Sequence, residues 1–276
     1  FLSVTAIVVK PIVTEFYRPF MAGVAPMMSV LPRRAAAFTR FLMAPDNPAY
    51  RIVHTDDVTA KAMVFHMFWM SFLIGSTFFI LSFNAANGVP GGETRLGFWL
   101  NLALHVYLAI VIWRYRRGLV SMMRGAEPDV SPMEERIARA FPLFGLAVTI
   151  GTWWVVNIVV SYGNFALLGS LPHYKTMTLL LFAPAMDTLI RGLVHHLSPP
   201  MTGEGPIAER AHYAAKRSYI RIGRVIVFGL VLLMIGRFWG MTPGGLASAG
   251  VGERLAANMI QFLMIISVGY IVYELV

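Results

Sequence analysis

The chain has 276 residues, of which 57% are hydrophobic and only 13% are charged. A soluble domain of this length needs far more polar surface, so the composition excludes an ordinary soluble protein and predicts an all-α, polytopic transmembrane helical bundle. The formal net charge of +9 does not indicate nucleic-acid binding, because most Lys and Arg residues lie in short segments between apolar runs. The absence of Cys excludes disulfides and cysteine metal sites.

Residues 1–58 form the first region. Its opening run, residues 1–9, is too short to span a bilayer and lacks a basic start, so we interpret it as the tail of a truncated helix rather than a signal peptide. Between residues 10 and 44, prolines and basic residues interrupt the apolar pieces, which predicts broken helices at the cytoplasmic interface. Since apolar runs reach both Phe1 and Val276, we expect the chain to be part of a longer protein.

Six later stretches are apolar enough and long enough to span a bilayer. They cover about residues 59–83, 96–113, 137–162, 174–194, 220–239 and 254–276. The first four form the region 59–194, in which Pro184 predicts a kink in the fourth span. Residues 195–219 are predicted to be a cytoplasmic loop, and residues 220–276 to be a closing transmembrane hairpin.

The distribution of Lys and Arg predicts the orientation of these spans. The segments before the first span, after the second and after the fourth are rich in basic residues, whereas the segments between them are poor. Because basic residues accumulate on the cytoplasmic side, this alternation places the N-terminal region and the Val276 end in the cytoplasm. It also supports six complete spans.

The two ends of the closing hairpin differ in charge. Arg217, Arg221 and Arg224 lie at the start of its first helix, together with Lys216. The far end carries less charge, with Arg237 beside Trp239. Basic side chains and tryptophan rings suit the headgroup layers, so we expect these residues to anchor the hairpin in the membrane.

One pair of ionisable residues falls inside the fourth span. Asp187 and Arg191 are four positions apart, so they share one face of the helix. Ionisable groups inside a membrane raise a functional hypothesis, here a proton or ion path in a secondary transporter. The alternative is a local ion pair near the cytoplasmic end, where Arg191 can extend to the headgroups. We favour the ion pair, because few other polar residues accompany it.

Two histidines, His66 and His105, lie at similar depth in the first two spans. On facing helices such a pair could ligate a haem, but a histidine bonded to a neighbouring helix or to water is the commoner arrangement and the one we favour. No spacing of His, Asp and Glu resembles a metal site, and phosphate-loop and nucleophile-elbow motifs are absent. The sequence therefore gives no support for an enzyme, a metal or a cofactor.

The closing hairpin and the span before it carry a family resemblance. The residues concerned are Ala215-Lys216-Arg217, Arg221 through Ile226, Gly236-Arg237-Phe238-Trp239-Gly240, Tyr273-Glu274-Leu275, and Pro184 through Leu193. Over about the last hundred residues the chain resembles the membrane region of large members of the MscS superfamily of mechanosensitive channels. The upstream spans resemble that family only in a general way, because its large members also carry extra helices ahead of the pore unit.

The last predicted helix has a beginning that looks like the pore helix of that family. Residues 246–252 are mostly Gly, Ala and Ser, as close packing around a narrow axis requires, but the pattern fades after Ala257. Bulky residues such as Phe262 and Ile265 follow, so we interpret this helix as the span before the pore unit. The pore would then lie beyond Val276.

The resemblance implies an auxiliary membrane domain of a tension-gated ion channel in the bacterial inner (plasma) membrane. Such a domain contacts membrane lipids and couples bilayer tension to pore helices outside this chain, and the residues predicted to anchor the closing hairpin would take part in the coupling. The resemblance also implies a homo-oligomer, a heptamer. Two alternatives remain open: a secondary transporter that uses the ionisable pair, and a structural or haem-binding subunit of a membrane complex that uses the histidine pair.

Overall fold

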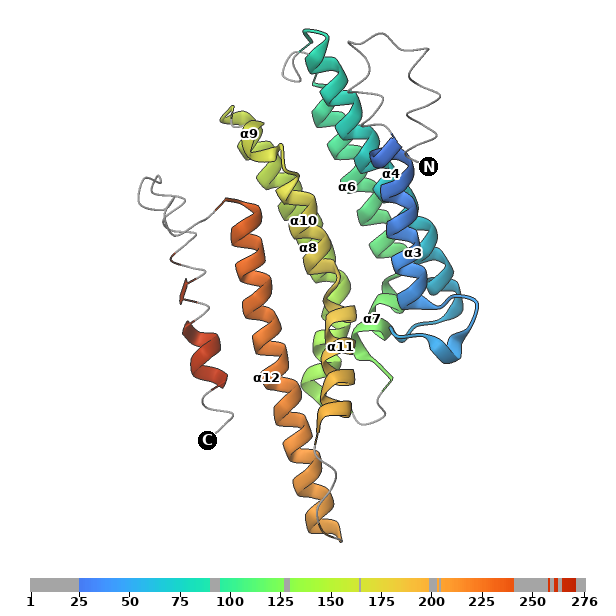
Figure 1. The fold of residues 1–276 in the computed structure, drawn as a ribbon, viewed down its shortest axis with the longest axis vertical. Coiled ribbons are helices and arrows are strands. Elements are labelled where there is room, and N and C mark those ends of the chain that lie inside the picture. The colour runs from blue at the N-terminus through green and yellow to red at the C-terminus, as the bar shows by residue number, and fades with distance from the viewer. Residues whose placement is uncertain are drawn as a thin grey trace. The chain divides into compact units, whose positions relative to one another are not determined.

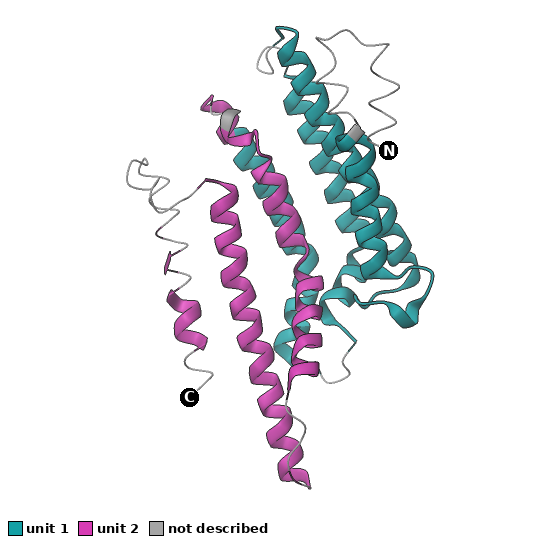
Figure 2. Ribbon diagram, viewed as in Figure 1, with its two compact units in different colours: residues 1–157 teal, residues 158–276 magenta. Residues whose placement is uncertain are grey.

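A computed structural model describes residues 25–89, 95–126, 130–163, 165–198, 203, 205–240, 258, 261–262 and 265–271. Every regular element within those ranges is a helix, and no strand occurs among them. The chain divides into two compact units, residues 1–157 and residues 158–276, and each is described by itself (Figure 2).

Four of the described helices are long and apolar enough to cross a membrane. They are α4 (Asp57–Ala86), α6 (Leu96–Arg114), α8 (Pro132–Ser161) and α12 (Pro206–Phe238). A fifth candidate is the pair α10 (Pro172–Leu181) and α11 (Ala183–Leu197), which meet at a bend of 52°. The structure therefore confirms an all-α protein with several candidate spans.

The predicted total of six complete spans is not confirmed. The predicted sixth span, residues 254–276, falls mostly outside the described residues, although its described positions are helical. The truncated helix predicted for residues 1–9 lies entirely outside them. The described part of the chain contains four candidate spans, or five if the bent pair is one span.

The N-terminal region of the first unit differs from the prediction. A π-helical turn, η1 (Ala25–Val30), leads into α3 (Leu31–Met43), and both pack along α4 (Figure 1). They reach well into α4, because a Cβ atom on Gly75 would lie 2.2 Å from the carbonyl oxygen of Met27. The described part of the predicted interfacial segment therefore lies beside a span. Pro32 does not break α3, since it occupies the first turn, where a missing N–H costs little.

α4 and α6 form an antiparallel pair (Figure 1). Asp56 caps the start of α4, where its carboxylate accepts a hydrogen bond of 2.8 Å from the backbone N–H of Thr59. A break at Tyr115 separates α6 from α7 (Arg116–Arg124). A Cβ atom on Gly118 of α7 would lie 2.3 Å from Thr59 Oγ1, so this glycine permits close contact between α7 and α4.

α8 runs antiparallel to α6 and α7 within the first unit. At one end the Nε of Arg124 lies 3.2 Å from an oxygen of Glu135. At the other end the ring centroids of Phe98 and Trp153 are 6.0 Å apart. An ion pair and an aromatic contact thus join α8 to its neighbours near both of its ends.

The second unit contains a helical hairpin. One leg is the bent pair α10 and α11, preceded by α9 (Phe165–Leu168), and the other is α12, a continuous helix of 33 residues (Figure 1). The bend lies at Phe182, directly before the first turn of α11, which contains Pro184, so the predicted kink is confirmed.

The loop predicted for residues 195–219 is much shorter in the structure. α11 extends to Leu197 and α12 begins at Pro206, after Gly205 with φ of +101°. At about 1.5 Å per residue α12 is about 50 Å long, well beyond the ~30 Å of a hydrocarbon core. Its first half is polar, so hydropathy does not reveal that this segment is helical.

Candidate functional site

The strongest polar cluster of the second unit joins α11 to α12. We call Asp187, Arg191 and Arg224 the Asp187 cluster. Arg191 Nε lies 2.8 Å from Asp187 Oδ2, and Arg224 contributes Nε at 2.6 Å from Oδ1 and Nη2 at 3.2 Å from Oδ2. Asp187 is only 7% exposed. Two guanidinium groups therefore neutralise one buried carboxylate, which would be costly to bury alone.

A close contact between helices brings Arg224 within reach of this carboxylate. Gly223 packs against Ile190 of α11, and a Cβ atom at position 223 would lie 2.7 Å from Ile190 Cγ2. The absence of a side chain lets α12 approach α11 at this point. The adjacent Arg224 then meets Asp187, which lies one helical turn before Ile190.

Two further contacts connect the legs of this hairpin. Trp239 donates a hydrogen bond of 3.0 Å from Nε1 to Thr176 Oγ1 of α10. Toward the opposite end of the hairpin, Lys216 Nζ lies 3.3 Å from His195 Nδ1 of α11. The bent leg is therefore joined to α12 on both sides of its bend, with the Asp187 cluster between these contacts.

The structure separates the predicted anchoring residues into two groups. Arg224 and Trp239 make contacts across the hairpin, whereas Arg217, Arg221 and Arg237 are exposed on α12. Sequence reasoning paired Asp187 with Arg191 and assigned Arg224 only to the membrane surface. It missed Arg224 as a partner because the two residues are 37 positions apart and meet only through tertiary packing.

The geometry of the Asp187 cluster suits a contact between helices better than a cation path. Both carboxylate oxygens accept hydrogen bonds from guanidinium groups, and the positive charge of these groups repels an approaching cation. The cluster therefore holds two helices together near one end of their apolar stretches.

The structure does not bring His66 and His105 together as a pair. His66 Nδ1 lies 2.6 Å from the hydroxyl oxygen of Tyr107, and His105 Nδ1 lies 2.8 Å from the backbone oxygen of Asn101. Tyr107 follows His105 by two positions, so the side chains of Tyr107 and His105 point about 200° apart around α6. His66 therefore contacts a different face of α6 from the one that carries His105. No group of three His, Cys, Asp or Glu side chains in the described ranges is arranged to hold a metal ion.

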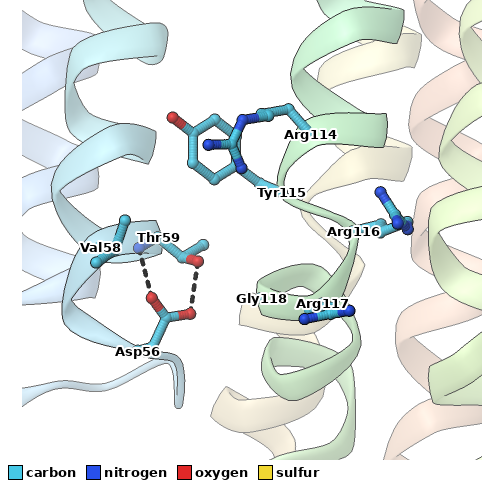
Figure 3. A pocket seen from close by; sticks show the side chains of 8 residues that line it. All are labelled: Asp56, Val58, Thr59, Arg114, Tyr115, Arg116, Arg117 and Gly118. Carbon is cyan, nitrogen blue, oxygen red and sulfur yellow. Dashed lines mark hydrogen bonds between the residues drawn. The ribbon is translucent and has the colours of Figure 1, made fainter.

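A second candidate site lies in the first unit, where α4 begins and α6 gives way to α7. It is a cavity of about 270 Å³, lined by Asp56, Val58 and Thr59 and by residues 114–118 (Figure 3). We call it the basic cavity, because three arginines and one aspartate leave its lining with a net formal charge of +2.

The charged side chains of the basic cavity differ in what they contact. Arg114 extends into the space between α4 and α6, beside the ring of Tyr115 (Figure 3). Arg116 is turned the other way, because it donates a hydrogen bond of 2.9 Å to the carbonyl oxygen of Trp113 and lies over that ring. Of the three arginines, Arg114 therefore enters this space, and Arg117 lines the cavity from the first turn of α7.

The single acidic side chain of the basic cavity is directed at the start of α4. Asp56 Oδ1 accepts from the N–H of Thr59 at 2.8 Å, and Oδ2 accepts from the hydroxyl of Thr59 at 2.6 Å. Burial by itself raises the pKa of Asp56, but these hydrogen bonds outweigh it, so the pKa lies below its usual value. Asp56 is therefore ionised at neutral pH.

Sequence reasoning did not identify the basic cavity. It used the arginines after the second span only as a signal of orientation. Gly118, one of its lining residues, lies against Thr59 and so allows α7 to approach the start of α4. In the sequence, the position of Gly118 after a run of arginines was the feature that could have indicated a close helix contact here.

No family model, curated protein or solved structure matched this chain.

Proposed function

We propose that this chain is an auxiliary membrane domain of a tension-gated ion channel. In this role it lies in the lipid and couples bilayer tension to pore helices outside the chain. The observation that carries the proposal is the hairpin of the second unit, in which a bent span is joined to a continuous helix on both sides of its bend.

A bent span offers a physical route from tension to movement. Tension favours whichever state occupies more membrane area, so a sensing element must differ in area between its states. Opening or closing the 52° bend changes the area that the hairpin occupies in the bilayer. Because the Asp187 cluster fixes α11 to α12, a change in the bend is passed on to α12.

The exposure of the candidate spans supports contact with lipid. In the most apolar 18-residue stretches, only 17% of the residues of α4, α8 and α12, and 33% of those of α6, are buried. Broad apolar surfaces therefore remain for lipid or for other helices. Membrane lipids and identical subunits are the partners that this role requires, and the heptamer and the bacterial inner membrane belong to the proposal by family resemblance.

The decisive experiment is patch-clamp recording from vesicles that contain the full-length gene product. We expect currents that appear when suction raises membrane tension. Arg224→Gln weakens the contact between α11 and α12, so this variant should need higher tension to open. Arg210→Gln removes an exposed charge from the start of the same helix and serves as the matched control, with an unchanged threshold.

Two results would contradict the channel proposal. The first is the absence of tension-activated current from a correctly assembled protein. The second is solute uptake that depends on an ion gradient and is abolished by Asp187→Asn without loss of assembly, which would instead support a transporter. A Soret band in the purified protein would separately revive the haem-binding alternative.

A further inference from the structure

We propose that the basic cavity of the first unit binds a phosphate group, carried either by the headgroup of an anionic lipid or by a small phosphate compound. All of its lining residues belong to the first unit, and they come from the ends of three helices. The proposal does not depend on the channel function, because it concerns different helices from those of the bent hairpin.

The lining of the basic cavity supplies hydrogen-bond donors for a phosphate group. Arg114 and Arg117 each carry a planar guanidinium group, which can donate two parallel hydrogen bonds to the oxygens of one phosphate. α6 ends and α7 begins at this cavity, so the negative end of one helix dipole offsets the positive end of the other. The two arginines therefore supply the attraction for an anion.

The acidic groups near the basic cavity are already engaged. Asp56 directs both oxygens at Thr59, as described above. The neighbouring Asp57 lies 2.6 Å from Nη2 of Arg51, outside the cavity. The net positive charge of the lining thus acts on an incoming anion without a competing carboxylate turned toward it.

The size and the support of the cavity also favour a phosphate group. Its volume of about 270 Å³ lies just below the roughly 300–1,000 Å³ typical of pockets for drug-sized ligands, so it suits a phosphate or a headgroup better than a nucleotide. The contact between Gly118 and Thr59 holds α7 against α4. The backbone of the helix that carries Arg117 is therefore held in place against α4.

The position of the cavity along the helices favours a lipid as the source. It lies where two candidate spans end, next to Trp113, whose ring suits the headgroup layer. The distribution of Lys and Arg along the chain predicts that this end faces the cytoplasm, where anionic lipids attract basic clusters. A free phosphate compound of the cytoplasm would approach the same arginines.

The experiment measures retained lipid by native mass spectrometry on the purified full chain. The probes are phosphatidylglycerol, phosphatidic acid and phosphatidylcholine, and inorganic phosphate and glycerol phosphate serve as soluble competitors. We expect the wild-type protein to retain the anionic lipids in preference to phosphatidylcholine. The double variant Arg114→Gln/Arg117→Gln should lower this retention at least tenfold.

A matched control separates a specific site from general attraction. Arg40→Gln/Arg136→Gln removes the same charge from two exposed positions of the first unit outside the cavity, and it should change retention less than twofold. Arg114→Lys/Arg117→Lys keeps the charge but loses the paired donors, so it should give an intermediate value. This variant also covers the case in which the glutamine variant fails to fold.

The arms of the experiment distinguish the two sources of phosphate. Displacement of the lipid by millimolar glycerol phosphate or inorganic phosphate indicates a site for free phosphate compounds, whereas resistance indicates a lipid site. Equal losses in the cavity variant and in the matched control would overturn the proposal. Equal retention of phosphatidylcholine and the anionic lipids by the wild type would overturn it as well.

Discussion

At the scale of single residues, the Asp187 cluster is asymmetric. One carboxylate lies against two guanidinium groups, and the side chains of Asp187 and Arg191 are only 9% and 12% exposed. Removing the carboxylate leaves two cations close together in a poorly solvated place. Removing Arg224 leaves a neutral pair, because Arg191 still faces Asp187. The carboxylate is therefore the member whose loss costs most.

This asymmetry gives a prediction for stability. We expect Asp187→Ala to lower the free energy of unfolding by about 3–5 kcal/mol, as measured for broken buried ion pairs, and Arg224→Ala to lower it by less. The double variant should show a coupling energy of about 0.5–3 kcal/mol. Denaturation of the purified protein in detergent measures all three values. Arg217→Ala, at an exposed position of α12, should stay within about 0.5 kcal/mol, and strictly additive effects would contradict the pairing.

At the scale of elements, the bend between α10 and α11 has a local cause and a tertiary one. Pro184 lacks the N–H that would continue the hydrogen bonds of α10, so the sequence itself favours a break. The contacts of Trp239 and Arg224 then fix each part against α12. The proline allows the bend, and α12 sets its direction.

Replacing this proline tests the local cause. In Pro184→Ala the restored N–H and the loss of the ring favour a straighter helix. The distance between spin labels on cysteines at positions 178 and 193 should then rise by about 2 Å, from the geometry of a helix with 1.5 Å per residue. Because the chain contains no Cys, two substitutions suffice for labelling. Pro172→Ala, in the first turn of α10, is the control and should leave the distance unchanged. An unchanged distance in Pro184→Ala would show that α12 alone imposes the bend.

Some elements could be predicted from the sequence because hydropathy marks them directly. The centres of α4, α6 and α8 agree with the predicted spans, since each is a long apolar run between polar turns. The polar first half of α12 was predicted as loop, because a helix outside the bilayer leaves no hydropathy signal. α3 was placed at the interface because its proline and its arginines concealed a face that packs on α4.

The candidate sites were harder to predict than the spans, because they depend on contacts between distant residues. Asp187 and Arg191 could be paired from their spacing along one helix. Arg224 could not, since Gly223 must first bring α12 close to α11. The proposed histidine pair shows the converse problem: similar depth in the membrane says nothing about rotation around the helix axis.

At the scale of the whole molecule, the distribution of Lys and Arg between the spans predicts the membrane topology. The segments between α4 and α6 and between α8 and α10 contain few basic residues and should face away from the cytoplasm. The segments that precede α4, join α7 to α8 and precede α12 should face the cytoplasm. The basic cavity would then lie at the cytoplasmic end of the first unit.

Single cysteines in this cysteine-free chain test that topology. A membrane-impermeant maleimide should label Asn87→Cys and Tyr162→Cys when it is applied to the non-cytoplasmic side of intact cells or spheroplasts. It should label Ala126→Cys and Ala211→Cys only after lysis. All four positions are exposed, so differences in reactivity report the side of the membrane. Labelling of Ala126→Cys before lysis would contradict the predicted orientation.

The length of α12 has a mechanical consequence. Of the contacts between α11 and α12 described above, that of Lys216 lies nearest the start of α12, and the helix continues from there to Pro206 over about 15 Å at 1.5 Å per residue. A rotation of α12 by about 5° about this contact would displace the Pro206 end by roughly 1.3 Å, comparable to the helix shifts of about 1–2 Å that separate functional states in regulated proteins. The polar extension would then convert a small change of tilt in the apolar stretch into a displacement outside it.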